Sequence, residues 1–292
     1  MEGALPRDRH PTSVAVLRLI AVLLVAAAPA CKKSRSETAV EEVPPEENGA
    51  GPAEAPEQPV KAAEPPPGPT GTIAGTVKLT GTPPEMPALQ RGSDGVCAAK
   101  EMRAEVVLVG AGGGLENALA RIEPGAVPGW VPSDPVVVDQ VDCMYRPRVQ
   151  GGVRGQTLEV RNSDKTTHNV NARKVAWGER RDSETIFNRG QPAGSPPLTG
   201  PIRDDDILKL KCDAHGWMQG YVVVSDNPYF ATSGEDGRFT IEKAPVGTYT
   251  VQVWHEFYGV KTEKVTVKEG ATASLDIIYD ADKDRPAEAG AR

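Results

Sequence analysis

Cys212, His215 and Met218 stand within seven residues of one another. Their thiolate, imidazole and thioether groups suit copper or zinc far better than magnesium or calcium. Two imidazoles and one thiolate in a trigonal plane, with a weak axial methionine, form a blue-copper electron-transfer centre. The segment therefore predicts a copper site that still lacks one imidazole.

The residues before Cys212 are expected to place it inside a fold. Polarity alternates strictly from Ile207 to Cys212, so the cysteine shares a strand face with two leucines and points with them into a core. Residues 220–225 read as the next strand, which puts His215 and Met218 on a tight turn between neighbouring strands. A short loop can bring all three donors to one point.

His168 is the natural source of the missing imidazole. It follows the strand predicted over 156–162 and begins another that is predicted over 168–172. Of the other histidines, His10 lies in the N-terminal segment, and the neighbours of His255 offer no obvious additional set of metal donors. We interpret His255 as structural, with a second metal or docking site as the alternative.

Together these segments resemble a cupredoxin over roughly 104–226. The resemblance rests on Tyr145-Arg-Pro-Arg-Val149, Gly155, the strand ending in Asn162, the pair His168-Asn169, and the loop with Cys212, His215 and Met218. The spacing Cys-x2-His-x2-Met is similar to that of amicyanin. The resemblance implies one mononuclear type 1 copper, with His168, His215 and Cys212 as equatorial ligands and Met218 as the axial ligand.

The resemblance also implies roles for residues beside the ligands. Asn169 would join the loop of His168 to the loop of Cys212 by hydrogen bonds. Electrons would leave through an exposed edge of His215, and Trp217 would lie partly exposed at a docking patch. Zinc is the competing metal, although methionine is a poor zinc ligand. A second alternative is no metal at all, with the same residues serving as ordinary core and surface groups.

For the function, the resemblance implies a one-electron carrier and not an enzyme, with other redox proteins of the bacterial cell envelope as partners. Two alternatives stay open: a protein that stores, senses or delivers copper without electron transfer, and a structural surface β-sandwich with a vestigial site. Hydrolysis is disfavoured, because no His-Glu-x-x-His zinc-peptidase motif occurs. The formal net charge is −7 without any basic stripe, which argues against nucleic acid as a partner.

The N-terminal residues predict export. In residues 1–31, arginines precede an apolar run that is too short to span a bilayer and is typical of a signal peptide. Cys31 follows Ala-Pro-Ala, which is similar to a bacterial lipobox, so lipidation is preferred over ordinary cleavage. Residues 32–70 are rich in Pro and Glu and are expected to be a disordered linker, and residues 281–292 a disordered tail. We expect a periplasmic or cell-surface protein that is anchored to a membrane by its lipid.

Cys97 and Cys143 are left once Cys31 and Cys212 have their assignments. In an exported protein, such a pair is most simply a disulfide. Separate buried thiols are the alternative.

Almost every periodic segment after residue 71 has period two, and no long amphipathic helix lies between these segments. Many short strands between Gly, Pro, Asn and Asp turns indicate β-sandwich architecture. Residues 173–206 are rich in Gly, Pro and charge and are predicted to be a long loop. The predicted strands are 72–79, 104–109, 118–123, 136–141, 156–162, 168–172, 207–212, 220–225, 238–242, 247–255, 260–267 and 272–279.

The last quarter resembles a carboxypeptidase regulatory-like, transthyretin-like small sandwich, on the turns at 233–237 and 244–249. Residues 72–83 resemble the opening strand of the same module. The expected fold class is all-β, a cupredoxin Greek-key β-sandwich plus this second sandwich. The expected domains are an opening strand in 71–103, the copper domain over 104–226 and the second sandwich over 227–280. The copper domain would then be inserted in the second sandwich; two sequential domains or one fused sandwich are the alternatives.

Overall fold

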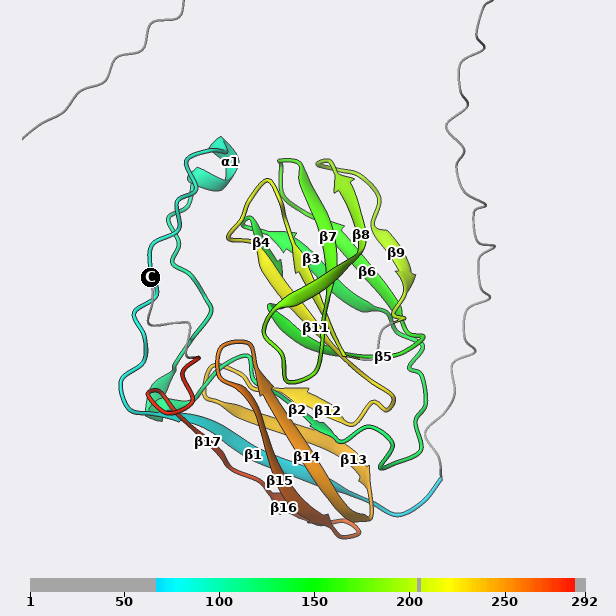
Figure 1. The fold of residues 1–292 in the computed structure, drawn as a ribbon. Helices are drawn as coiled ribbons and strands as arrows, with labels where there is room; N and C mark the ends of the chain where they lie inside the picture. Colours follow the sequence, from blue (N-terminus) through cyan, green and yellow to red (C-terminus); the bar gives the residue numbers. More distant parts are fainter. Residues whose placement is uncertain (1–66, 204–205, 287–292) are drawn as a thin grey trace, which may run out of the picture. The chain divides into compact units, whose positions relative to one another are not determined.

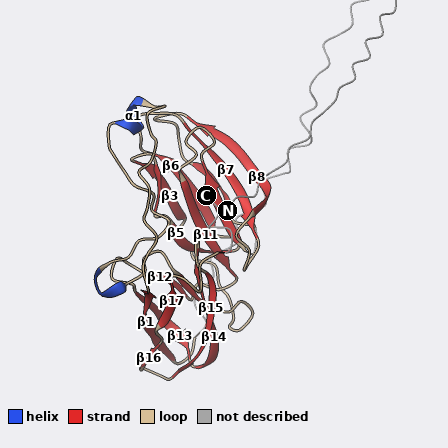
Figure 2. Cartoon of the chain, turned by 60° about the vertical axis from the view of Figure 1, so that its left-hand side comes forward, coloured by secondary structure: helices blue, strands red, loops and turns tan. Residues whose placement is uncertain are grey.

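Strands make up about half of residues 67–203 and 206–286, which are the part of the chain that the computed structural model describes (Figure 1). The predicted signal peptide, Cys31 and all but the end of the predicted linker lie outside these residues. Within them, no helix is both long enough and apolar enough to cross a membrane. Helical structure there is limited to the single turns α1 (Gly95–Ala98) and η1 (Ala111–Gly113), both on the connections between the first two strands (Figure 2). The all-β class is confirmed.

Two sheets form the sandwich that contains the predicted copper ligands. Side chains from both sheets, among them Tyr145, Val160, Leu210 and Val222, pack into one buried apolar cluster. The first sheet has the order β5 (Val149–Val153), β11 (Gln219–Ser225), β10 (Ile207–Lys211), β7 (His168–Val175) and β8 (Asp182–Gln191). The second has the order β4 (Met144–Arg146), β3 (Val136–Val141), β6 (Thr157–Asn162) and β9 (Leu198–Pro201).

The alternating sequence of β10 positions the site as expected. Leu208, Leu210 and Cys212 are buried in the core of this sandwich, whereas Lys209 and Lys211 are only partly buried. β10 pairs antiparallel with β7 on one side and with β11 on the other. Because the end of β10 lies beside the start of β7, Cys212 and the first residue of β7 come close together.

A second sandwich is built from strands at both ends of the described chain. Its core contains Ile73, Ala120, Ile241 and Val253. One sheet has β1 (Thr70–Thr80) in the middle, paired with β13 (Arg238–Pro245), β16 (Thr272–Ser274) and β17 (Ile277–Asp280). The other has the order β12 (Phe230–Thr232), β2 (Leu119–Ile122), β14 (Gly247–His255) and β15 (Gly259–Val267).

The boundary at residue 104 differs from the prediction. β2 pairs antiparallel with β12 and β14, and Val107 and Leu115 lie in the core of the second sandwich. The ligand-bearing sandwich therefore begins at β3 and interrupts the second sandwich between β2 and β12. Residues 104–109 form no regular strand and contribute only an isolated bridge from Val109 to Leu115.

The prediction of a long loop over 173–206 was wrong. This segment contains the end of β7 and all of β8 and β9. β8 pairs with β7 along the edge of the sheet. Its residues are mostly exposed on both faces, so it shows no apolar alternation. The short strands β4, β5 and β12 were also not predicted. In β5 the sequence has Gly151 and Gly152, and a Cβ at Gly151 would meet the Phe230 ring at 2.2 Å.

The start of the predicted disordered tail is ordered. Ala281 is fully buried, and its backbone N–H donates to the Thr80 carbonyl. The Asp284 carboxylate forms an ion pair with Lys261, with 2.8 Å between Oδ2 and Nζ. Residues 287–292 lie outside the described part of the chain.

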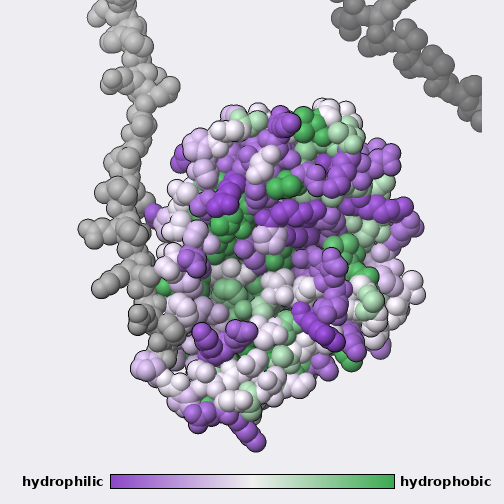
Figure 3. All heavy atoms as spheres, turned by 180° about the vertical axis from the view of Figure 1, so that it is seen from behind, coloured by the Kyte–Doolittle hydropathy of each residue, from purple (hydrophilic) through white to green (hydrophobic). Residues whose placement is uncertain are grey.

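The two sandwiches share a buried contact region. Arg148, which directly precedes β5, forms an ion pair with Glu256, which follows β14, and both side chains are only 4% exposed. An apolar cluster surrounds this contact with residues from both sandwiches, namely Leu119, Val149, Val175, Ile207, Tyr221, Val223 and Trp254. Apolar residues elsewhere on the face in Figure 3 are interspersed among hydrophilic ones.

Candidate metal centre

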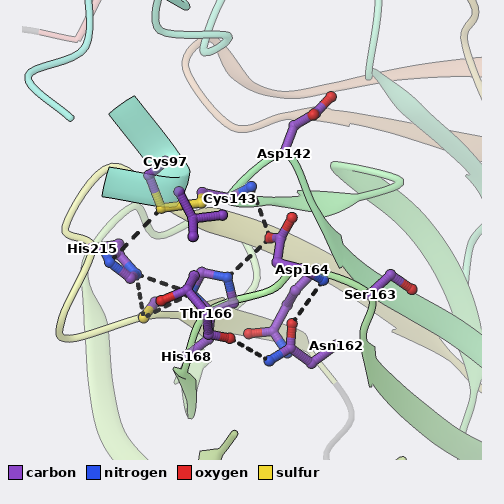
Figure 4. Close-up of polar contacts among 12 residues, drawn as sticks. Cys97, Asp142, Cys143, Asn162, Ser163, Asp164, Thr166, His168 and His215 are labelled. Atoms are coloured by element: carbon purple, nitrogen blue, oxygen red, sulfur yellow. Dashed lines mark hydrogen bonds and ion pairs between the residues drawn. A yellow bond between two sulfur atoms is a disulfide. The ribbon is translucent and has the colours of Figure 1, made fainter. Parts of the chain in front are cut away.

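Three buried side chains bring their donor atoms together at one end of the ligand-bearing sandwich. His168 Nδ1 lies 2.9 Å from His215 Nδ1 and 3.9 Å from Cys212 Sγ, and His215 Nδ1 lies 3.6 Å from the same sulfur. The exposed fractions are 1% for His168, 1% for Cys212 and 4% for His215. Figure 4 shows the imidazoles of His168 and His215 joined by a dashed line between their ring nitrogens.

These donors fit a single transition-metal ion. Nitrogen and sulfur ligands bind such ions at about 2.0–2.3 Å, so donors of one ion lie about 3–4 Å from each other. The three measured separations fall close to that range. Two imidazoles and a thiolate match the equatorial donors of a type 1 copper centre, and they also suit zinc.

Met218 closes the loop that carries two of the donors. Its backbone N–H donates to the His215 carbonyl at 2.8 Å, and its carbonyl accepts from the Cys212 N–H at 3.3 Å. Its side chain is fully buried in the same apolar cluster as Cys212. The axial role of Met218 stays a prediction.

Asn169 connects the two segments that carry the ligands. Its side-chain oxygen accepts from the Asp213 N–H at 2.7 Å and from the Ala214 N–H at 3.4 Å. Its own backbone N–H points to Cys212 Sγ at 3.5 Å. The start of β7 and the loop after β10 are therefore held at a fixed separation.

The carboxylate of Asp213 is surrounded by amide groups. It accepts from the side-chain amides of Asn169, Asn171 and Asn188 at 2.8–3.1 Å. The hydrogen bond from Asn171, followed by those from Asn188 and Asn169, lowers the pKa of Asp213. Sequence reasoning missed Asn188, because it lies on β8, which was predicted to be loop.

Each imidazole also meets a carboxylate on its other nitrogen. His168 Nε2 lies 2.9 Å from Asp164 Oδ2, and His215 Nε2 lies 3.4 Å from Asp94 Oδ2. Burial lowers the pKa of His168, and the Asp164 carboxylate opposes that shift. Sequence reasoning missed both acids. Asp164 precedes His168 by four residues and could have been found from that spacing, whereas Asp94 has no sequence link to His215.

Residues 87–104, here called the strap, cover His215. The strap folds back on itself through hydrogen bonds from the Leu89 N–H to Met102 and from the Ala104 N–H to Pro87, and it carries α1. A disulfide joins Cys97 to Cys143, which confirms the predicted pairing. Cys97 Sγ lies 3.9 Å from His215 Nε2 (Figure 4).

Because the strap covers His215, the prediction that one edge of this imidazole is exposed is wrong. His215 is only 4% exposed, and its Nε2 faces Asp94 and the disulfide. Trp217 is half-buried, and its indole N–H donates to the Cys143 carbonyl at 3.1 Å. The Arg91 guanidinium lies 5.9 Å from the centre of the Trp217 ring.

His255 lies away from the metal-ligand cluster, fully buried at the end of β14 in the second sandwich. Its Nδ1 accepts from the backbone N–H groups of Phe257 and Tyr258 at 3.1 and 3.4 Å. Among the described residues, the potential metal-binding groups of acidic, Cys and His side chains do not include it. The interpretation of His255 as structural agrees with these contacts.

Comparison with known families places the last strands. Residues 219–279 match the family model of the carboxypeptidase regulatory-like domain. That resemblance is confirmed. The matched segment begins in β11 and runs through β17, so it contains most of the second sandwich but not β1 or β2.

Solved structures similar to this chain are cupredoxins and a copper enzyme. A purple cupredoxin from Nitrosopumilus maritimus is 20% identical with a TM-score of 0.27, and the match covers 31% of this chain and 99% of that one. The Cu(I) form of an amicyanin variant is 19% identical with a TM-score of 0.27, covering 38% and 100%. A copper-containing nitrite reductase from Thermus scotoductus is 20% identical with a TM-score of 0.27, covering 35% of this chain but only 25% of the enzyme. No curated protein matches the sequence.

Proposed function

We propose that this chain is a type 1 copper protein that carries one electron at a time in the bacterial cell envelope. The observation that supports this most directly is the meeting of His168 Nδ1, Cys212 Sγ and His215 Nδ1 at buried positions. Donors of this kind and number favour copper, provided that Met218 supplies a weak fourth ligand. Copper, when bound, supplies one-electron chemistry.

The protein's own residues keep the donors still and keep water away. The ladder between β7 and β10 fixes the positions of His168 and Cys212, and Asn169 ties the loop after Cys212 to β7. The apolar cluster around Cys212 excludes water from the sulfur. Rigid ligands keep the change in ligand geometry between the two oxidation states small. A dry, apolar surrounding raises the reduction potential.

The location and partners form part of the same proposal. The targeting segment in residues 1–31 and the Cys97–Cys143 disulfide both favour an oxidising compartment outside the cytoplasm. Lipidation at Cys31 would hold the protein at a membrane, and the Pro/Glu-rich residues after it would let the folded part search for redox partners. These partners would be electron donors and acceptors of the cell envelope.

Spectroscopy of the full chain loaded with Cu(II) tests the metal assignment. We expect an intense blue thiolate-to-copper absorption band and a narrow copper hyperfine splitting in the EPR spectrum. Cys212→Ser should abolish both, whereas His255→Gln, which alters a buried histidine of the other sandwich, should leave both unchanged. A colourless wild-type protein would refute the proposal.

Copper storage or delivery is the second candidate, and the burial of His215 favours it. A ligand that is only 4% exposed, as His215 is beneath the strap, is poorly placed for direct electron exchange with a partner. Voltammetry of the copper-loaded chain separates the two functions. A reversible one-electron wave supports the carrier, and its absence, together with copper transfer to a chelator, supports storage.

A further inference from the structure

The two imidazoles of the candidate site share an arrangement on their outer sides. In each ring Nδ1 faces the donor cluster and Nε2 faces a carboxylate, Asp164 for His168 and Asp94 for His215. Both acids are partly buried, with side chains 10% and 19% exposed. The site thus has one negative group behind each ring.

Both carboxylates are held in place by further hydrogen bonds. Asp164 Oδ2 also accepts from the Cys143 N–H at 2.8 Å. Asp94 Oδ1 accepts from the Val96 and Cys97 N–H groups at 2.8 and 3.1 Å, which caps α1. Its Oδ2 accepts from the Thr166 hydroxyl at 2.6 Å.

The disulfide joins two of the three residues whose backbone N–H groups donate to these acids. Cys97 donates to Asp94, Cys143 donates to Asp164, and their sulfurs are bonded to each other. The strap therefore brings Asp94 to His215 from a part of the chain outside the ligand-bearing sandwich.

We propose that Asp94 and Asp164 are positioning residues of the copper centre, and this rests on the proposed function. Each carboxylate holds the proton of its imidazole on Nε2, which leaves Nδ1 free to bind the metal. A carboxylate behind a ligating histidine fixes the ring and makes the imidazole a stronger donor. Two negative groups this close also stabilise Cu(II) more than Cu(I), so together they lower the reduction potential.

The test uses Asp94→Asn and Asp164→Asn, with Asp142→Asn as the matched control. Asparagine can still cap α1 and accept from the backbone, so the fold is retained. Asp142 is an exposed acid near the same end of the sandwich that pairs with Lys100 and touches neither imidazole. All three variants remove one negative charge, which separates contact with the ring from net charge.

We expect each ring-contacting variant to bind Cu(II) at least tenfold more weakly than wild type, in the range usual for loss of such a partner. If Cu(I) affinity is unchanged, the reduction potential rises by about 59 mV for each factor of ten. The double variant should show the larger effect, and Asp142→Asn should match wild type. Potentials and affinities of Asp94→Asn and Asp164→Asn that equal those of Asp142→Asn would overturn the proposal.

A measurement on metal-free protein keeps this proposal separate from the copper assignment. In ¹⁵N-resolved NMR spectra of the histidine rings, His168 and His215 should carry slowly exchanging Nε2 protons. Asp164→Asn should speed exchange at His168 and Asp94→Asn at His215, without the reciprocal effect. If wild type binds no copper, the proposed function fails, while these spectra still test the roles of the two carboxylates. Rings that lack a proton on Nε2 would overturn those roles.

Discussion

At the scale of single residues, the site depends on amides as much as on its metal donors. Asn169 satisfies two backbone N–H groups of the loop after Cys212 and donates to the Asp213 carboxylate. Asn171 and Asn188 donate to that carboxylate from β7 and β8. The loop that carries Cys212 and His215 is thus fixed to two neighbouring strands through one acid.

Asn169→Ala should loosen this loop. It removes the acceptor of the Asp213 and Ala214 N–H groups, and we expect a loss of about 1–3 kcal/mol in the free energy of unfolding, measured in urea. Asn188→Ala is the control, because Asn188 contacts the same carboxylate but no backbone N–H of the loop. Equal losses in the two variants would contradict a special role for Asn169.

His255 should make stability depend on pH. Burial, with Arg148 as the next cause, lowers its pKa to about 3. The unfolded chain binds a proton at about pH 6.5 and the folded chain does not, so the contribution of His255 to stability is full above pH 6.5. It is lost as the pH falls from 6.5 toward 3, at up to about 1.4 kcal/mol per pH unit.

Urea unfolding of metal-free protein between pH 7 and pH 4 measures this effect. Burial lowers the pKa of His168 as well, so it adds to the slope in the same direction. His255→Gln should reduce the slope of unfolding free energy against pH relative to wild type. The contribution of His168 to that slope should remain in the variant. An unchanged slope in the variant would show that His255 does not titrate between the two states.

At the scale of elements, the strap decides what can reach the site. It contributes α1, Asp94 and Cys97 to the side of His215 that would otherwise face solvent. Its attachments at that end include the disulfide, hydrogen bonds from Arg91 to the backbone of Asp142 and from Thr166 to Asp94, and the ion pair of Lys100 with Asp142. Access of solvent to the His215 imidazole therefore depends on whether the strap stays attached.

Replacing both Cys97 and Cys143 by serine should release the strap. The disulfide spans 46 residues of sequence, so its loss should destabilise the protein by about 4 kcal/mol in the chain-entropy model. His215 should then react faster with diethylpyrocarbonate in metal-free protein, as followed by mass spectrometry. His255 in the same sample is the internal control, and an unchanged His215 rate would mean that the strap stays in place without its disulfide.

The sequence predicted those parts of the site and fold that follow a local pattern. Alternation before Cys212 located β10 and its buried face, and β3 and β14 match their predicted ranges to the residue. β8 was not predicted, because its residues are mostly exposed on both faces and their hydrophobicity does not alternate. Asp94 was not predicted, because the fold of the strap brings it to His215, and no spacing along the sequence indicates that contact.

At the scale of the whole described chain, one buried ion pair links the two sandwiches. Arg148 and Glu256 pair in two hydrogen bonds, and Arg148 also donates to the Gln219 carbonyl at 3.3 Å. Each charge is almost completely removed from water. Removing one partner of such a pair leaves an uncompensated buried charge, which costs more than removing both.

Arg148→Met should therefore destabilise the protein by about 3–5 kcal/mol. The double variant Arg148→Met with Glu256→Met should recover most of that loss, since it leaves no buried charge behind. Differential scanning calorimetry would measure both, and would show whether the single variant separates one unfolding transition into two. A double variant no more stable than the single one would argue against this account.

The interruption of the second sandwich sets the order in which the chain can fold. The strands that pair with β1 all follow β11 in the sequence, and β2 likewise pairs only with the strands β12 and β14. The inserted sandwich, in contrast, has all its strands between β3 and β11. In any process that releases the chain from its N-terminus, the insert can complete its sheets first. The surrounding sandwich must hold β1 and β2 unpaired until its last strands arrive, so any aggregation through open strand edges during synthesis would begin there.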